Sequence, residues 1–152
     1  MKTKIFCDIA DFKTIKFFNK KSIVDGFTTN PSLMRLAGAK NYKDYSLKIL
    51  KVCKKKPISF EVLADNPKEM LKQAYEINSW GKNIFVKIPV VNSKGLFMGS
   101  VIKELSSKRI KLNITAVYTF EQTKKVYKIL NKKSKYLYLL VEWQIMVKTH
   151  CQ

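Results

Sequence analysis

Short apolar runs alternate along the chain with longer segments whose apolar residues recur at helical spacing. The short runs predict strands, which lie at 5–9, 22–26, 58–64, 83–89, 110–118 and 136–141. The helical spacing predicts helices over 41–55, 96–106 and 119–130 and further helices that begin after Asp11, at Asn30 and at Asn66. Aspartate and asparagine are common helix N-caps, and proline at 31 and 67 suits a first helical turn.

This alternation implies a parallel sheet covered by helices, which is an α/β fold of one domain. No glycine-rich loop of the GxGxxG or GxxxxGK[ST] type follows any predicted strand, which disfavours a nucleotide-binding doubly wound fold. The competing architecture is a (β/α)₈ TIM barrel, which needs eight units in about 200 residues or more. The pattern therefore predicts about the first six βα units of such a barrel.

Two ionisable residues interrupt apolar strands. Lys87 lies in IFVKIPV and Glu61 lies in SFEVL. Burial lowers the pKa of a lysine, and a neutral amine can attack a sugar carbonyl to form a Schiff base. Lys87 is thus either a catalytic amine or an edge-strand lysine that points to solvent. Glu61 is either a general acid/base or an ion-pair partner of Lys87.

Further polar residues recur near the carboxyl ends of the predicted strands, where a barrel holds its active site. These residues are Asp8, Asn30, Asn113 and Thr115. We expect several of them to converge with Lys87 and Glu61, because alternate strand residues point inward. Asp8 has a second interpretation as a helix-capping acid.

Composition disfavours several other classes of protein, namely specific nucleic-acid binders, metalloproteins and membrane proteins. The formal net charge is +19. Arg35 and Arg109 are the only arginines, and the lysines are spread over the sequence. This pattern favours a solvated lysine surface over a specific nucleic-acid site. The only histidine is His150, and the three cysteines have no metal-site or disulfide spacing, so we expect no metal and reduced thiols. With no apolar run of membrane-spanning length and no signal-peptide pattern, we expect a cytoplasmic protein without a membrane partner.

Five segments together resemble the small transaldolase and fructose-6-phosphate aldolase family. They are KIFCDIA at 4–10, VDGFTTNPSL at 24–33, ISFEV at 58–62, VKIPV at 86–90 and LNITAVY at 112–118. The resemblance covers Lys4 to about Lys135. The TTNPSL and VKIP segments are specific to the family, and the order and spacing of all five agree with it.

The resemblance implies a (β/α)₈ barrel and a class I (Schiff-base) enzyme that uses no metal or organic cofactor. Lys87 would form the Schiff base with a ketose phosphate, and Asp8 would take the proton of the sugar hydroxyl during C–C cleavage. Glu61 and Thr115 would hold a water that relays protons, and Asn30 and Asn113 would bind substrate hydroxyls. Full-length relatives are expected to be homo-oligomers.

The residue in the third strand separates the two activities of the family, since transaldolases carry Glu there and fructose-6-phosphate aldolases carry Gln. Glu61 therefore favours transaldolase. The reaction implied is transfer of a dihydroxyacetone unit from sedoheptulose 7-phosphate to glyceraldehyde 3-phosphate in the pentose phosphate pathway. A fructose-6-phosphate aldolase is the alternative enzyme, and a basic nucleic-acid-binding domain is the alternative of another class.

The resemblance ends near Lys135. The family continues with a pattern such as S-[IV]-F-x-G-R-[IM]-A-D-x-G, whose Ser and Arg would bind the substrate phosphate, and residues 136–152 lack it. Reading from the third base of each codon, Trp143–Gln144 must give alanine and Met146–Val147 must give glycine, spaced as in A-D-x-G. We therefore expect 1–135 to be the N-terminal part of the barrel and 136–152 to be a frameshifted, non-native tail, which would leave the chain with little transaldolase activity.

Overall fold

The computed structural model describes residues 4–131 and the backbone of residues 137–139. Six strands and six helices make up this part of the chain. In order they are β1 (Phe6–Asp8), α1 (Phe12–Phe18), β2 (Gly26–Thr28), α2 (Pro31–Leu36), α3 (Tyr42–Val52), β3 (Ile58–Glu61), α4 (Pro67–Ser79), β4 (Ile84–Pro89), α5 (Gly99–Ser107), β5 (Leu112–Thr115), α6 (Phe120–Ile129) and β6 (Leu137–Leu139).

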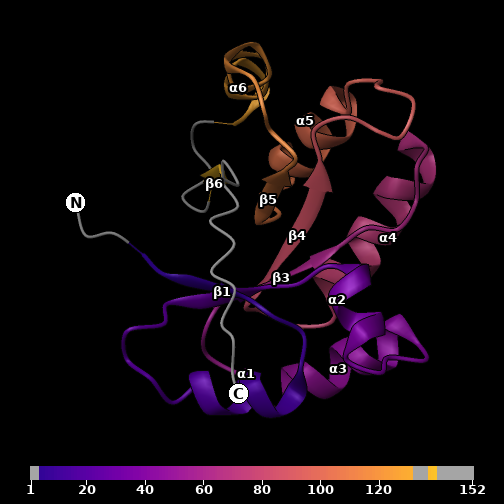
Figure 1. Ribbon diagram of the computed structural model, residues 1–152. Coiled ribbons are helices and arrows are strands. Elements are labelled where there is room, and N and C mark those ends of the chain that lie inside the picture. The colour runs from indigo at the N-terminus through magenta and orange to yellow at the C-terminus, as the bar shows by residue number, and fades with distance from the viewer. Residues whose placement is uncertain (1–3, 132–136, 140–152) are drawn as a thin grey trace.

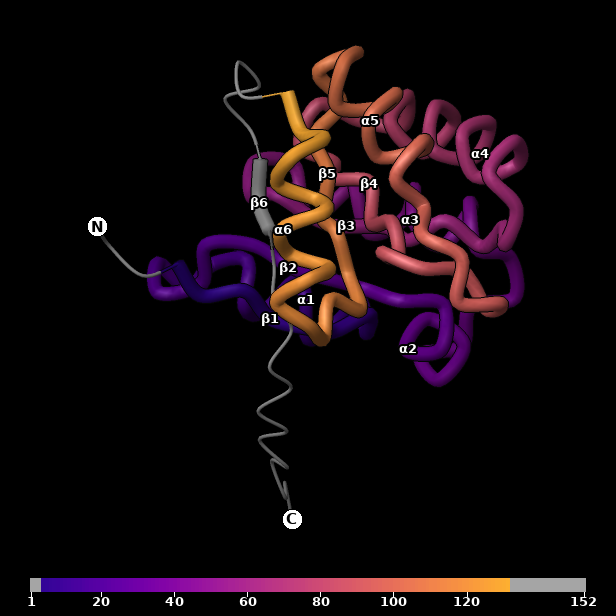
Figure 2. Tube along the Cα trace, turned by 90° about the horizontal axis from the view of Figure 1, so that it is seen from above, coloured from indigo at the N-terminus to yellow at the C-terminus, as the bar shows by residue number. Residues whose placement is uncertain are grey.

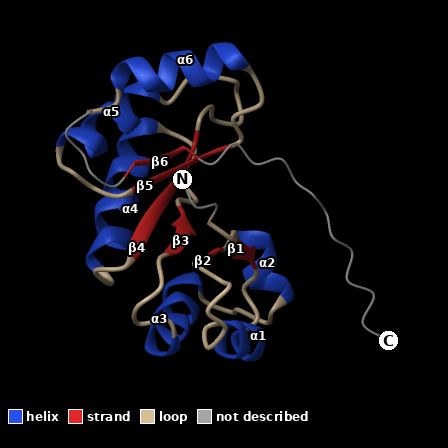
Figure 3. Ribbon diagram, turned by 90° about the vertical axis from the view of Figure 1, so that its left-hand side faces the viewer, coloured by secondary structure: helices blue, strands red, loops and turns tan. Residues whose placement is uncertain are grey.

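The strands form one parallel sheet in the order β1-β2-β3-β4-β5-β6, so each strand pairs with the next one along the chain. The helices follow one another around the outside of this curled sheet (Figures 1 and 3). Seen from above, α4 and α5 run beside each other, and the two helices also contact one another (Figure 2). The predicted fold class, a partial (β/α) barrel, is confirmed.

Four polar side chains begin helices as the sequence predicted or allowed. Asp11, Asn30, Asn41 and Asn66 each accept a hydrogen bond from the backbone N–H three residues later, and proline follows Asn30 and Asn66 directly. These bonds satisfy N–H groups that have no partner inside the helix. The caps at Asp11, Asn30 and Asn66 therefore fix the points at which the chain leaves the sheet and turns into a helix, and Asn41 fixes the start of α3 after α2.

The second strand was predicted at 22–26, but β2 is Gly26–Thr28. Its start is set by a close approach, because a Cβ at Gly26 would meet the ring of Phe6 and would lie 2.7 Å from the carbonyl oxygen of Pro57. The segment before Gly26 is a loop whose Asp25 carboxylate accepts a hydrogen bond from the N–H of Ile5, at 2.8 Å.

The central strands are buried on both faces. Four consecutive residues of β5 and five of the six in β4 are buried, although both strands carry polar side chains. The aliphatic residues of these strands pack against the helices, for example Ile88 against a core that includes Met70 and Ile102. Parallel sheets covered by helices bury their strands in this way, and the polar residues therefore stand on the other face of the sheet, inside the curl.

Within the described residues, no helix is long and apolar enough to span a membrane. Cys7 and Cys53 are free thiols, and burial raises the pKa of Cys53 to about 11. The predicted sixth strand is present as β6, whereas the predicted tail otherwise lies outside the described residues. The proposed frameshift therefore stays a prediction.

Candidate active site

Three of the predicted residues occupy one row across the middle of the sheet. Glu61 at the end of β3 pairs in register with Lys87 of β4, and Lys87 pairs with Asn113 of β5. Residues in register on neighbouring strands project from the same face of the sheet. The strand order alone therefore brings an acid, an amine and an amide together.

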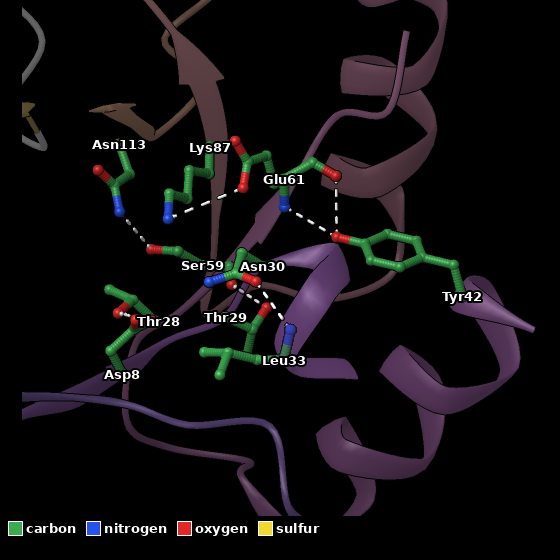
Figure 4. A network of polar contacts seen from close by, with 10 residues as sticks. All are labelled: Asp8, Thr28, Thr29, Asn30, Leu33, Tyr42, Ser59, Glu61, Lys87 and Asn113. Atoms are coloured by element: carbon green, nitrogen blue, oxygen red, sulfur yellow. Dashed lines mark hydrogen bonds and ion pairs between the residues drawn. The ribbon is translucent and has the colours of Figure 1, made fainter. Parts of the chain in front are cut away.

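Lys87 is 3 % exposed, so it is not an edge-strand lysine that points to solvent. Its Nζ lies 3.8 Å from Oε2 of Glu61, whose side chain is 20 % exposed (Figure 4). A buried ammonium requires a nearby counter-charge, and a carboxylate beside it can also receive its proton. The pair therefore fits both predicted functions of Glu61, ion-pair partner and acid/base.

Asn113 brings an unsatisfied acceptor to the same row. Its Nδ2 donates to Oγ of Ser59 at 3.1 Å, while its buried Oδ1 has no hydrogen-bond partner among the described residues. A buried polar atom without a partner costs free energy, about 1–3 kcal/mol. A donor group of a ligand, such as a sugar hydroxyl, would remove that cost.

Asp8 and Asn30 come from the first two strands, at the end of β1 and just after β2. Thr28 donates its hydroxyl to Oδ1 of Asp8 at 2.8 Å, which connects the exposed end of β1 to buried β2. The Oδ1 atom of Asn30 accepts from the N–H of Leu33 at 2.8 Å and caps α2. Figure 4 shows Asp8 and Asn30 on the side toward which the Lys87 amine extends. Asp8 is thus not the cap of α1, because Asp11 has that function.

Thr115 is the last residue of β5 and is buried. It lies two positions beyond Asn113, on the same face of the strand, and pairs in register with Pro89. It is therefore one step further toward the carboxyl ends of the strands than the row of Lys87. Asp8, Glu61 and Thr115 are thus the last residues of their strands, Asn30 lies in the loop after β2, and Lys87 and Asn113 lie within β4 and β5.

Tyr42 also contacts the site, although no pattern in the sequence points to it. Its hydroxyl donates to the carbonyl oxygen of Glu61 and accepts from the N–H of Glu61, both at 2.8 Å. Burial raises the pKa of this hydroxyl well above its usual range. The neighbouring strand β2 has already ended at Thr28, so a side chain from α3 takes the place of a strand partner for Glu61.

Ser59 and Thr28 were also not predicted, although a signal for them exists. Both are buried polar residues on strands and alternate with large apolar ones, such as Phe27 beside Thr28 and Phe60 beside Ser59. A period of two places them on the inner face, with Glu61. They make the hydrogen bonds that orient Asn113 and Asp8.

Comparison with known proteins shows the family to which the sequence is similar. The profile of the family described as "Transaldolase/Fructose-6-phosphate aldolase" matches residues 5–139. A "Probable transaldolase" of Dehalococcoides mccartyi is 37 % identical over 119 residues, which are 78 % of this chain and 53 % of that protein. Proteins with the same description from Herpetosiphon aurantiacus and Methanococcus vannielii are 37 % and 36 % identical and are covered to 51 % and 53 % of their lengths.

The chain thus spans about half the length of the curated relatives it matches. The matched region contains the whole row of Glu61, Lys87 and Asn113 as well as Asp8, Asn30 and Thr115. On the strength of this match and of the partial barrel, the chain belongs to the transaldolase/fructose-6-phosphate aldolase family.

Proposed function

We propose that this chain carries the Schiff-base centre of a class I transaldolase, with Lys87 as the nucleophile. The observation that supports it most directly is the burial of Lys87 beside a carboxylate, 3.8 Å from Nζ to Oε2. The neutral amine is the form that attacks a carbonyl carbon. Glu61 is placed to take the proton that the amine must lose.

In the proposed reaction the Lys87 amine adds to the ketone carbon of a ketose phosphate and forms a carbinolamine. Loss of water, with protons relayed between Glu61, Thr115 and a water molecule, gives the iminium ion. Asp8 then takes the proton of the C4 hydroxyl, the C3–C4 bond breaks, and the aldose leaves. The bond electrons remain as an enamine on Lys87, which attacks the aldehyde of the acceptor in the reverse sequence.

Asn113 and Asn30 are proposed to bind hydroxyls of the substrate. The orphaned Oδ1 of Asn113 supports this assignment, because a sugar hydroxyl is a donor. Sedoheptulose 7-phosphate as donor substrate and glyceraldehyde 3-phosphate as acceptor follow from Glu61, the residue typical of the transaldolase branch. Direct cleavage of fructose 6-phosphate without an acceptor would instead identify the aldolase branch.

The experiment is borohydride trapping on the full 152-residue chain. Dihydroxyacetone, which has no phosphate, is incubated with the protein, the imine is reduced, and the modified peptide is located by mass spectrometry. We expect one adduct on Lys87, lost in Lys87→Met and retained in Lys72→Met, an exposed lysine on α4. Adducts scattered over surface lysines, with Lys87 no more modified than Lys72, would refute the proposal.

A further inference from the structure

The lysine runs that are far apart in the sequence lie on one face of the fold. Four loops lead from a helix into a strand and are fully described, at 19–25, 53–57, 80–83 and 108–111. Because all strands are parallel, these loops share the amino-terminal end of the sheet, opposite the candidate active site. Their basic residues, here called the loop lysine face, are Lys20, Lys21, Lys54, Lys55, Lys56, Lys82, Lys108, Arg109 and Lys111.

The two ends of the sheet differ in charge. Asp25 is the only acid in these four loops, and its carboxylate is bonded to the N–H of Ile5. The five loops that lead from a strand into a helix carry Asp11, Asp65 and Lys94 as their charged residues. The positive charge of these loops is thus concentrated at the end of the sheet away from the candidate active site.

Side-chain hydrogen bonds hold neighbouring loops of this face together. Lys56 Nζ donates to the carbonyl oxygen of Lys21 at 2.6 Å. Asn83 Nδ2 donates to the carbonyl oxygen of Lys56 at 2.8 Å, and Lys111 Nζ donates to that of Lys82 at 2.6 Å. Every bond joins one loop to the next, so the face is ordered before any partner binds, which limits the entropic cost of binding.

Two surface clefts are lined by this face. One, of about 380 Å³, has Lys54, Lys55, Lys82, Lys111 and Phe85 among its lining residues. The other, of about 320 Å³, is lined by Lys82, Lys108, Arg109 and Lys111. Together the two clefts therefore draw their lining residues from three of the four loops.

We infer that the loop lysine face binds the sugar–phosphate backbone of nucleic acid without reading its sequence. A partner that matches such an extended positive face must carry a row of negative charges, as phosphates do along a strand. Lysine contacts phosphate as a point charge and lacks the fork with which arginine reads guanine. The aromatic ring of the first cleft, Phe85, is 7 % exposed, so it offers no platform for base stacking.

The inference does not depend on Schiff-base chemistry, since the loop lysine face and the candidate active site face opposite ends of the sheet. Binding is measured by fluorescence anisotropy of a labelled mixed-sequence RNA of about 20 nucleotides, longer than one binding site. Salt is varied between about 0.05 and 0.2 M, because each phosphate contact to a single strand contributes about 0.7 to the slope of log K against log salt.

The test variant changes four exposed loop residues to glutamine: Lys54, Lys55, Lys82 and Lys108. The control variant removes the same charge from exposed helix positions: Lys68, Lys72, Lys103 and Lys125. We expect the loop variant to bind RNA at least tenfold more weakly than the unsubstituted protein. The slope of log K against log salt should fall in magnitude by about 3, and the control variant should change little in either quantity. Lys87→Met should bind as the unchanged chain does.

Two outcomes would overturn the inference: no RNA binding, or equal weakening of RNA binding by both variants. If RNA does not bind but vesicles of anionic lipid do, the partner of the loop lysine face is a membrane surface instead. Circular dichroism of both variants shows whether they fold. A second measurement does not need variants: bound RNA should protect Lys55 and Lys82, but not Lys72, from acetylation. Equal protection of all three lysines would also contradict the inference.

Discussion

At the residue scale, Tyr42 shows how a side chain outside the predicted site can determine its geometry. The hydroxyl satisfies both backbone groups of Glu61, the residue whose carboxylate lies beside Lys87. Without it, the end of β3 would have no partner on the side where β2 has turned away. The direction of the Glu61 side chain follows from the position of its backbone, so Tyr42 acts on the site through Glu61.

The corresponding prediction concerns stability. Tyr42→Phe keeps the ring and leaves the N–H and carbonyl groups of Glu61 without their partner, so we expect a loss of about 1–3 kcal/mol in the free energy of unfolding. Urea denaturation measures it, with Tyr118→Phe as the control because Tyr118 is 80 % exposed. Equal midpoints for the two variants would show that water replaces the hydroxyl without cost.

At the element scale, the helix caps connect local sequence to pH dependence. Asp11 begins α1 and accepts from the N–H of Thr14 at 2.7 Å and from its hydroxyl at 2.6 Å. These hydrogen bonds from Thr14 lower the pKa of the Asp11 carboxyl. A lowered folded-state pKa adds stability above the unfolded-state value, which is about 3.9, and that stability is lost as the pH falls through the folded-state pKa.

Asp11→Asn is the variant that isolates this effect, because asparagine also caps helices but carries no charge. We expect the unchanged chain to exceed the variant in unfolding free energy near neutral pH and the difference to shrink below about pH 4. Urea denaturation of both proteins from neutral to acid pH measures that difference, in which the other carboxylates cancel. A difference that is constant with pH would show that the charge of Asp11 contributes nothing.

Most elements could be predicted because the signals for them are local. The caps at Asn30 and Asn66 and the apolar run around Lys87 lie within a few residues of the structure that they specify. The start of β2 could not be predicted, because it depends on the close approach of Phe6 and Pro57 to Gly26. Tyr42 could not be predicted for the same reason, because its hydrogen-bond partner is the backbone of Glu61 on another element.

At the scale of the whole molecule, the grouping of the loop lysines at one end of the sheet is not evident from their positions along the sequence. The lysines appear spread along the chain, yet the parallel topology gathers those of the loops at one end of the sheet. The helices, by contrast, intersperse acids among their lysines, as in the pair of Lys43 with Glu76 at 2.8 Å. Like charges that are close together raise the free energy of the folded state, so the loops should carry more repulsion than the helices.

This difference predicts how salt and charge removal change stability. The loop variant with glutamine at Lys54, Lys55, Lys82 and Lys108 should unfold at a higher urea concentration than the unchanged chain in low salt. The control variant at Lys68, Lys72, Lys103 and Lys125 should gain less, because acids lie among those lysines on the same helices. The advantage of the loop variant should fall as salt rises, since the Debye length shortens to about 8 Å at 0.15 M. If the two variants are equally stable at every salt concentration, the loop lysines are too well solvated to repel one another. The stability of this protein would then depend on its net charge and not on where the lysines lie.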